Sequence, residues 1–281
     1  MNPSKQIIAF IKITRPVNVV ITFFVVAVAI LISQKSPTNL FVIIMASLAE
    51  SFVVAAGNII NDYFDIETDR IAHPKRALVT NQISKNEAVA FYVVLNLFAL
   101  FLSLIISTSL LIITTITIIV LFHYSKRLKQ LPLWGNVTVS LLTASAFIYG
   151  GFAVDNPASA IVPAVFAFLI NMIREIVKDI EDIEGDSAIS IKTFPIRFGI
   201  ASSKKMILTI TVLLIAFTFY PFINQLYNIE YFIVVMIVVN PVLVLCIKYL
   251  YNNSKQNNFT MVSRLLKLNM IFGLIAIYLG K

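Results

Sequence analysis

Residues 40–70 read LFVIIMASLAESFVVAAGNIINDYFDIETDR, an apolar run that ends in a cluster of amide and carboxylate side chains. An α-helix needs about 20 apolar residues to cross the hydrocarbon core of a bilayer. Backbone N–H and C=O groups in that core must be satisfied within the segment, which favours a helix over an open strand. The stretch therefore predicts a membrane-spanning helix that carries an acidic segment to one membrane face.

The rest of the chain repeats this apolar pattern. Of its 281 residues, 59% are hydrophobic and 13% are charged, and the mean hydropathy is +0.90. Soluble domains are roughly a quarter charged. We therefore predict an all-α, polytopic membrane protein with one domain over residues 1–281. The nine expected spans lie at 17–33, 39–62, 86–106, 108–124, 136–154, 157–179, 206–224, 230–251 and 262–280.

The Lys and Arg residues determine the expected orientation. Of 22 such residues, all but Lys35 and Lys281 fall on the side of the N-terminus and the long loops. The positive-inside rule places this side in the cytoplasm and the C-terminus outside. Topology thus explains the net charge of +8, and no nucleic-acid partner is predicted.

Two acidic segments are expected at the cytoplasmic face, one after the second span and one after the sixth. If the second helix continues through the first segment, its amide and carboxylate side chains fall within an arc of about 100°, and Glu67 points elsewhere. In the second segment three aspartates share a narrow face, whereas Glu181 does not. The residues on these two faces are Asn58, Asn61, Asp62, Asp65 and Asp69, and then Asp179, Asp182 and Asp186.

Stacked carboxylates on one helix face repel each other, and this repulsion is stronger near a bilayer. A hard divalent cation removes the repulsion. Mg²⁺ prefers oxygen ligands and often completes its coordination with substrate phosphate oxygens. A solvated acidic helix end is the simpler interpretation of either segment alone, but the pair on one side favours a metal site.

Cations that suit a phosphorylated substrate stand close to both acidic segments in the sequence. Arginine can bind phosphate with two N–H groups, and lysine acts as a mobile point charge. Each cation alone is explained by topology, but next to a metal site they predict a substrate that carries phosphate. The candidates are Arg76, Lys126, Arg127, Lys129, Lys178 and Lys192.

The segments 61–70 and 179–186 resemble the two signature motifs of the UbiA superfamily of intramembrane prenyltransferases. Asn61, Asp65 and Asp69 match the pattern Asn-x-x-x-Asp-x-x-x-Asp, and Asp182 and Asp186 match Asp-x-x-x-Asp. The resemblance spans nearly the whole chain and also covers the run 15–18, which ends in Asn18.

The resemblance implies a nine-helix bundle around a central cavity, in which two Mg²⁺ ions bridge the aspartate motifs and the diphosphate of a prenyl donor. The implied metal ligands are Asn61, Asp65, Asp69, Asp179, Asp182 and Asp186, and Asn18 and Asn58 are implied substrate contacts. Asn61, Asp65, Asp69, Asp182 and Asp186 are the implied catalytic residues.

Within the superfamily, the runs 57–65 and 174–179 are most similar to the archaeal digeranylgeranylglyceryl phosphate synthases. This resemblance implies transfer of geranylgeranyl from its diphosphate to the lipid phosphate geranylgeranylglyceryl phosphate. An aromatic acceptor, as in quinone or chlorophyll-type prenylation, remains an alternative. A secondary transporter is the alternative of another class, because acids at the membrane also occur there.

Overall fold

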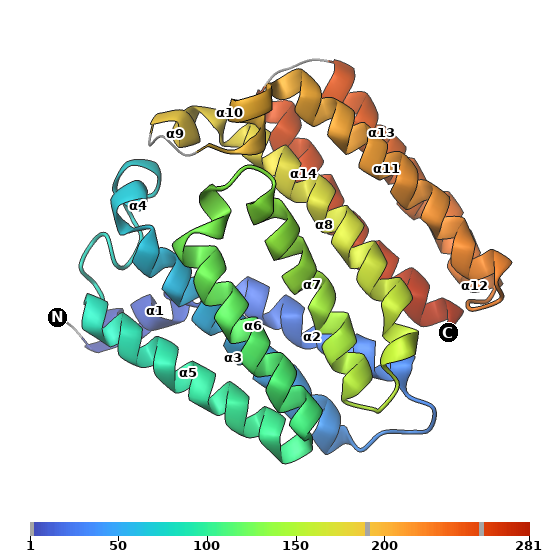
Figure 1. The fold of residues 1–281 in the computed structure, drawn as a ribbon, viewed down its shortest axis with the longest axis horizontal. Helices are drawn as coiled ribbons and strands as arrows, with labels where there is room; N and C mark the ends of the chain where they lie inside the picture. Colours follow the sequence, from blue (N-terminus) through green and yellow to red (C-terminus); the bar gives the residue numbers. More distant parts are fainter. Residues whose placement is uncertain (1–2, 189–191, 253–255) are drawn as a thin grey trace. The chain divides into compact units, whose positions relative to one another are not determined.

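The computed structural model describes residues 3–188, 192–252 and 256–281, and every regular element in these ranges is a helix (Figure 1). Eight stretches of it are long and apolar enough to cross a membrane. They are α2 (Pro16–Ser33), α3 (Leu40–Phe64), α5 (Lys85–Ile106), α6 (Thr108–Lys126), η2 with α8 (Pro157–Ala160, Ile161–Glu181), α11 (Ile200–Ile223), α12 with η3 and α13 (Ile229–Val234, Val235–Val239, Asn240–Asn252) and α14 (Gln256–Gly280). The predicted all-α membrane class is confirmed.

The fifth predicted span, 136–154, corresponds to α7 (Trp134–Phe152). This helix has 19 residues but is not among the eight apolar stretches. Its first turns carry Asn136, Thr138 and Ser140, all of which are buried in the protein. The expected nine spans therefore correspond to eight apolar spanning helices and the more polar α7.

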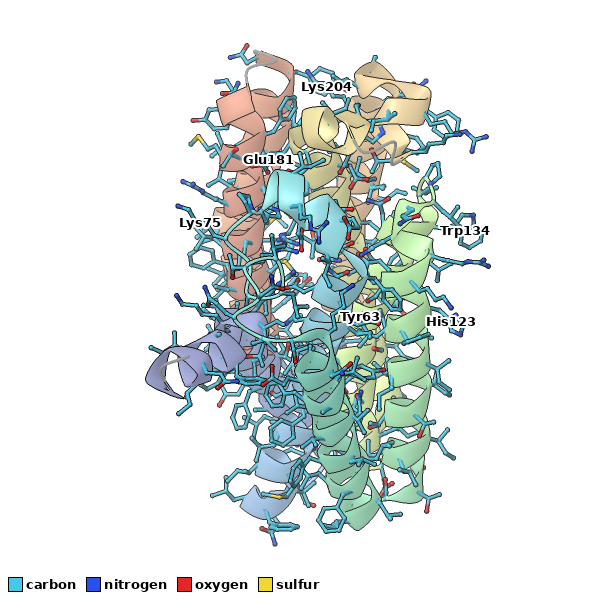
Figure 2. All side chains as sticks on the ribbon, turned by 90° about the vertical axis from the view of Figure 1, so that its left-hand side faces the viewer. Tyr63, Lys75, His123, Trp134, Glu181 and Lys204 are labelled. Carbon is cyan, nitrogen blue, oxygen red and sulfur yellow. The ribbon has the colours of Figure 1, made fainter. Side chains whose placement is uncertain are left out.

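Five short helices lie outside the predicted spans: α1 (Pro3–Ile13), α4 (Ile66–Ala72), η1 (Leu128–Gln130), α9 (Ile183–Ala188) and α10 (Phe194–Phe198). In Figure 2, α1 (slate blue) extends sideways from the other helices of its unit. It buries Ala9 and Ile13 and exposes Ile7, Ile8 and Ile11. Arg15, at the junction with α2, has a left-handed backbone with φ 53°.

The chain forms two compact units. The first unit comprises residues 1–128 and 146–158, and the second comprises residues 129–145 and 159–281. The first acidic segment belongs to the first unit and the second segment to the second. The single-domain organisation over residues 1–281 stays a prediction.

In the first unit, α3 packs against α2, α5 and α6. α5 begins with a capping box, in which Ser84 and Glu87 each bond the other's backbone N–H with the side chain. Gly150 of α7 lies so close to α2 that a Cβ atom there would be 2.5 Å from the Cβ of Ala29. Only glycine fits this approach without displacing a helix.

The interior of the first unit also holds polar side chains. The Tyr149 hydroxyl lies 2.9 Å from Ser103 Oγ, which is 2.7 Å from Thr114 Oγ1. Glu50 of α3 is buried, and its Oε2 has no hydrogen-bond partner among the described atoms.

Asn18, on the first turn of α2, is exposed.

In the second unit, α8 packs against α11 and α14. Its buried residues include Ile170, Ile173, Val177 and Ile180, which recur every three or four positions and so form one face of the helix. The opposite face of α8 can therefore carry charge, and Lys178 is exposed near the end of the helix. The packing of α8 thereby sets the direction in which the second acidic segment leaves the apolar region.

Candidate active site

The first acidic segment begins where α3 ends. The shared face of its acids was predicted on the condition that α3 continues through the segment. Asp65 instead interrupts the helix in the bridge region of the backbone map, at φ −93° and ψ 3°. Hydrogen bonding nevertheless continues across the break, from Asp65 N to Asn61 O (3.0 Å) and from Asp69 N to Asp65 O (2.7 Å). Asn61, Asp65 and Asp69 therefore remain one turn apart, as a continuous helix would place them.

Two amide side chains of α3 have different partners. Asn61 Nδ2 donates to Asp65 Oδ2 at 2.9 Å, so the amide and carboxylate of the motif are in direct contact. Asn58 Nδ2 donates to the carbonyl of Thr14 at 2.8 Å, which ties α3 to the residue after α1. One of its two N–H donors is engaged in the fold, so Asn58 can offer a substrate its other N–H and its carbonyl oxygen.

Two arginines reach the first acidic segment from other parts of the chain. Arg15 Nη2 lies 2.6 Å from Asp62 Oδ1, and Arg76 Nη1 lies 3.1 Å from the same oxygen. Arg76 Nη1 is also 2.5 Å from Asp69 Oδ2. Arg76 was a predicted phosphate contact. Arg15 contributed to the predicted topology and to the family resemblance of the run 15–18, and Asp62 had no predicted role apart from its place on the acidic face.

The pKa of Asp69 is raised despite its contact with Arg76. Burial raises the pKa of its carboxyl group and is the largest effect, while the charge and hydrogen bond of Arg76 lower it. The neighbouring charges of Asp62 and Asp65 raise the pKa further. Arg76 therefore partly offsets the cost of holding three carboxylates together at this site.

Glu67 lies outside this arrangement. Its side chain is 74% exposed and pairs with Arg70 at 2.9 Å, three residues further along α4. An exposed pair of this kind contributes little to stability. Its position agrees with the expectation that Glu67 points away from the face of Asn61, Asp65 and Asp69.

The second acidic segment has the same backbone construction. α8 ends at Glu181, and Asp182 interrupts the helix at φ −92° and ψ 5° before α9 begins. The bonds from Asp182 N to Lys178 O and from Asp186 N to Asp182 O are both 2.9 Å. Asp182 and Asp186 are thus one turn apart, as Asp65 and Asp69 are.

The side chains around the second segment differ from those around the first. Asp179 Oδ2 accepts a hydrogen bond from Asn136 Nδ2 at 2.8 Å. The pKa of Asp186 is raised to about 6, first by burial and then by the charge of Asp182, although the charge of Lys178 lowers it. Asn136 was not among the predicted ligands.

Glu181 has a structural contact. Thr260 Oγ1 of α14 donates to Glu181 Oε1 at 2.7 Å. Glu181 therefore joins α8 to α14 and differs from Glu67, although the sequence pattern placed both glutamates off the acidic faces. The spacing of α8 alone does not reveal a partner that lies 79 residues away.

The other predicted cations end helices or lie in loops. Lys126 ends α6 and Arg127 follows it, and both are exposed. Lys129, in η1, is partly buried. Lys178 and Lys192 are exposed near the second segment in the chain. These five side chains can therefore be reached from outside the apolar part of the protein.

The donor chemistry fits a hard divalent cation. In the part of the chain that the structure describes, no three His, Cys, Asp or Glu side chains already converge to hold an ion. Mg²⁺ does not require such a cage, because it commonly binds one or two carboxylates and takes water and phosphate oxygens for the rest. The Asp65 carboxylate beside Asn61, and the Asp182 and Asp186 carboxylates one turn apart, offer oxygen atoms of the kind that such an ion binds.

Comparison with known proteins gives consistent results. The family described as the UbiA prenyltransferase family matches residues 19–271. The digeranylgeranylglyceryl phosphate synthase of Methanobrevibacter smithii is 33% identical over 290 residues, covering 100% of this chain and 98% of the relative. A solved structure of a digeranylgeranylglyceryl phosphate synthase is 31% identical, with a TM-score of 0.83 and 98% of each chain covered.

A more distant solved structure shares the fold. It is a UbiA homologue from Archaeoglobus fulgidus, bound to GPP and Mg²⁺, and is 20% identical with a TM-score of 0.67 over 96% of this chain and 99% of that one. Because the family match covers most of the chain, the protein is a multi-pass membrane enzyme that transfers prenyl groups, and the transporter alternative is set aside. The chain belongs to the UbiA prenyltransferase family.

Proposed function

We propose that this enzyme transfers a geranylgeranyl group from geranylgeranyl diphosphate to the free hydroxyl of geranylgeranylglyceryl phosphate, in a Mg²⁺-dependent step of membrane ether-lipid synthesis. The observation that carries the proposal is the match, over nearly full length, to relatives named digeranylgeranylglyceryl phosphate synthase. The two acidic segments with nearby cations supply the chemistry that a diphosphate donor requires.

Six residues would hold the metal in this proposal. They are Asn61, Asp65, Asp69, Asp179, Asp182 and Asp186. When bound, Mg²⁺ supplies Lewis-acid stabilisation for the charge that develops on the departing diphosphate. Support comes from the donor chemistry of these side chains and from the A. fulgidus homologue, which is bound to Mg²⁺ and a prenyl substrate.

The chain's own cations would bind and orient the donor. Arg76 lies beside Asp69 with 26% of its side chain exposed, so it can reach both the acidic segment and a diphosphate. Lys178 and Lys192 would add mobile positive charge near the second segment. Charge-assisted hydrogen bonds from these groups to phosphate oxygens are stronger than neutral ones.

The acceptor would be recognised partly through its own phosphate. Lys126, Arg127 and Lys129 form a separate basic group between α6 and α7, and an uncharged acceptor would not need them. Asn18 and Asn58 remain proposed substrate contacts. An aromatic acceptor is the second candidate, because the family description alone does not specify the acceptor.

We also propose that the N-terminus and the loops at 62–85, 124–136 and 180–205 are cytoplasmic, and that the C-terminus is outside. The distribution of Lys and Arg supports this orientation. Single cysteines placed in these loops, in a variant that lacks Cys246, should resist labelling by an impermeant thiol reagent in intact cells. A cysteine after Gly280 should react. Labelling of any of these loops from outside would contradict the proposed orientation.

The direct test of the acceptor is mass spectrometry of lipid products. The purified enzyme is incubated with geranylgeranyl diphosphate, Mg²⁺ and either geranylgeranylglyceryl phosphate or 4-hydroxybenzoate. We expect a doubly prenylated glyceryl phosphate and no prenylated benzoate. The opposite pair of results would assign the enzyme to aromatic prenylation.

A further inference from the structure

Asp62 is the centre of an ion-pair cluster in the first unit. Its Oδ1 atom accepts hydrogen bonds from Arg15 and Arg76, at 2.6 and 3.1 Å. The aspartate lies on α3, Arg15 precedes α2, and Arg76 follows α4. One buried carboxylate thus joins three segments that are separate in the sequence.

The charges of this cluster cancel. Arg15 and Arg76 carry two positive charges, and Asp62 and Asp69 carry two negative ones. The Asp62 and Asp69 side chains are only 7% and 4% exposed, so solvent screens this group weakly. Removing Asp62 would leave two guanidinium groups next to each other, with Asp69 as the remaining carboxylate.

Arg76 contacts both carboxylates of the cluster, so one of these contacts can be lost while the other remains. Asp62 and Asp69 both accept from its Nη1 atom, at 3.1 and 2.5 Å. A guanidinium group has five N–H donors, so further donors of Arg76 can bind a phosphate. Because Asp62 holds Arg76 independently of Asp69, the Asp69 carboxylate can take another partner without releasing the arginine.

The backbone at Arg15 supports a specific role for this contact. Arg15 adopts φ 53° and ψ 69°, which non-glycine residues seldom adopt. This conformation lies at the turn from α1 into α2, and the side chain reaches Asp62, 47 residues later. The turn therefore keeps a guanidinium group, 36% of whose side chain is exposed, at the edge of the acidic segment.

We propose that Asp62 is a positioning residue for recognition of the donor's diphosphate. It holds Arg15 and Arg76 beside the metal-binding side chains, so that their remaining N–H groups face the diphosphate, and it does not itself bind the metal. This inference rests on the proposed function. It assigns to Asp62 a role that differs from those of Asp65 and Asp69, although all three belong to one acidic segment.

The test uses the full-length protein in detergent and inorganic diphosphate as the probe, with binding measured by titration calorimetry at several Mg²⁺ concentrations. For Asp62→Asn we expect diphosphate affinity to fall about tenfold, as for the loss of a charge-assisted contact. The Mg²⁺ concentration for half-maximal binding should stay within about twofold of the wild-type value. Asp65→Asn should raise that concentration about tenfold or more, and Glu67→Gln, the exposed control, should match the wild type.

A double-mutant cycle tests whether Asp62 acts through Arg76. In an Arg76→Gln background, Asp62→Asn should change diphosphate affinity by less than about threefold, because residues that act as a unit are not additive. Equal tenfold losses in both backgrounds would overturn the proposal. So would an Asp62→Asn enzyme whose Mg²⁺ requirement rises as much as that of Asp65→Asn.

Two further outcomes separate a folding defect and a failure of the proposed function from a failure of the proposed role of Asp62. If Asp62→Asn does not fold, Asp62→Glu retains the charge; it should weaken diphosphate binding with an unchanged Mg²⁺ requirement, and a raised requirement would identify residue 62 as a metal ligand. If the wild type itself binds no diphosphate with Mg²⁺, the proposed function fails. If the wild type and Asp62→Asn bind it equally, only the role of Asp62 fails.

Discussion

The two acidic segments share a backbone but differ in their charge environment. Asp65 and Asp182 each interrupt a helix with nearly the same φ and ψ angles, and each is followed by a short helix that carries a further aspartate one turn on. In the first segment, Asp62 and Asp69 are paired with arginines. In the second, Asp179 is bonded to the neutral amide of Asn136, and Asp186 has its pKa raised to about 6.

This difference suggests a division of tasks that the shared motif pattern conceals. Arginine pairs hold the first segment together before any ligand arrives, because each buried carboxylate there already has a cation. In the second segment the pKa of Asp186 stays raised although the charge of Lys178 lowers it, so the cost of holding this carboxylate charged is only partly offset. A divalent ion should therefore stabilise the second segment more than the first.

The largest expected effect is on turnover. Asp65→Ala, Asp69→Ala, Asp182→Ala and Asp186→Ala should each lower kcat/KM by roughly 100-fold or more, because each removes a proposed ligand of the metal that stabilises the leaving group. Steady-state assays with geranylgeranyl diphosphate measure this. Strong loss in one segment only would show that the matching backbones do not have matching roles.

Metal removal should separate the two segments. Chelation should abolish turnover and added Mg²⁺ should restore it. We expect Mg²⁺ with diphosphate to slow amide hydrogen exchange about tenfold or more at 179–188, and less at 61–72, where arginine pairs already reduce local opening. Mass-spectrometric exchange on the full chain measures both. Equal protection would contradict the proposed difference in preorganisation.

The basic group between the two segments in the sequence should affect acceptor binding. Replacing Lys126, Arg127 and Lys129 with glutamine should raise KM for geranylgeranylglyceryl phosphate about tenfold and KM for geranylgeranyl diphosphate about twofold or less. Loss of a phosphate contact made equally in ground and transition states raises KM with little change in kcat. If KM for the donor rises more, these residues serve the diphosphate instead.

The smallest effects should come from substitution of Glu67 and Glu181, the two glutamates that lie off the predicted acidic faces. The effects of the two substitutions should differ from each other. Glu67→Gln removes an exposed pair and should change unfolding free energy by less than about 0.5 kcal/mol. Glu181→Ala removes the partner of Thr260 and should cost about 1 kcal/mol. Both variants should keep most of their turnover. Thermal unfolding in detergent distinguishes them, and a large loss of turnover in Glu67→Gln would contradict the assignment of Glu67 to a face away from the aspartates.

Much of the fold could be predicted from the sequence, because hydropathy reports directly on the apolar environment. The predicted spans 17–33 and 86–106 differ from α2 and α5 by one residue at one end. The predicted span 206–224 began late, because α11 starts at Ile200 and includes Lys204 and Lys205. Hydropathy marks the part of a helix that lies in the apolar region, whereas the helix itself extends beyond it.

The candidate site was only partly predictable. The i to i+4 spacing predicted that Asn61, Asp65 and Asp69 lie one turn apart, as the structure places them, because helical periodicity is local. The contacts of Asp62 with Arg15 and Arg76 were missed, because they join residues 47 and 14 positions apart and depend on tertiary packing. The helix breaks at Asp65 and Asp182 were also missed, because aspartate does not mark the end of a helix as clearly as proline or glycine does.

The helix breaks at Asp65 and Asp182 determine where the chain can accept inserted residues. An extra residue between Asn61 and Asp65 would rotate everything beyond it by about 100° and move Asp69 off its face. Extra residues in the loop between Ala72 and Ser84 would leave that phase unchanged and cost little closure entropy. In a library of one-residue insertions, the four positions between Asn61 and Asp65 and those between Asp182 and Asp186 should therefore be depleted, while insertions around Asn81 survive.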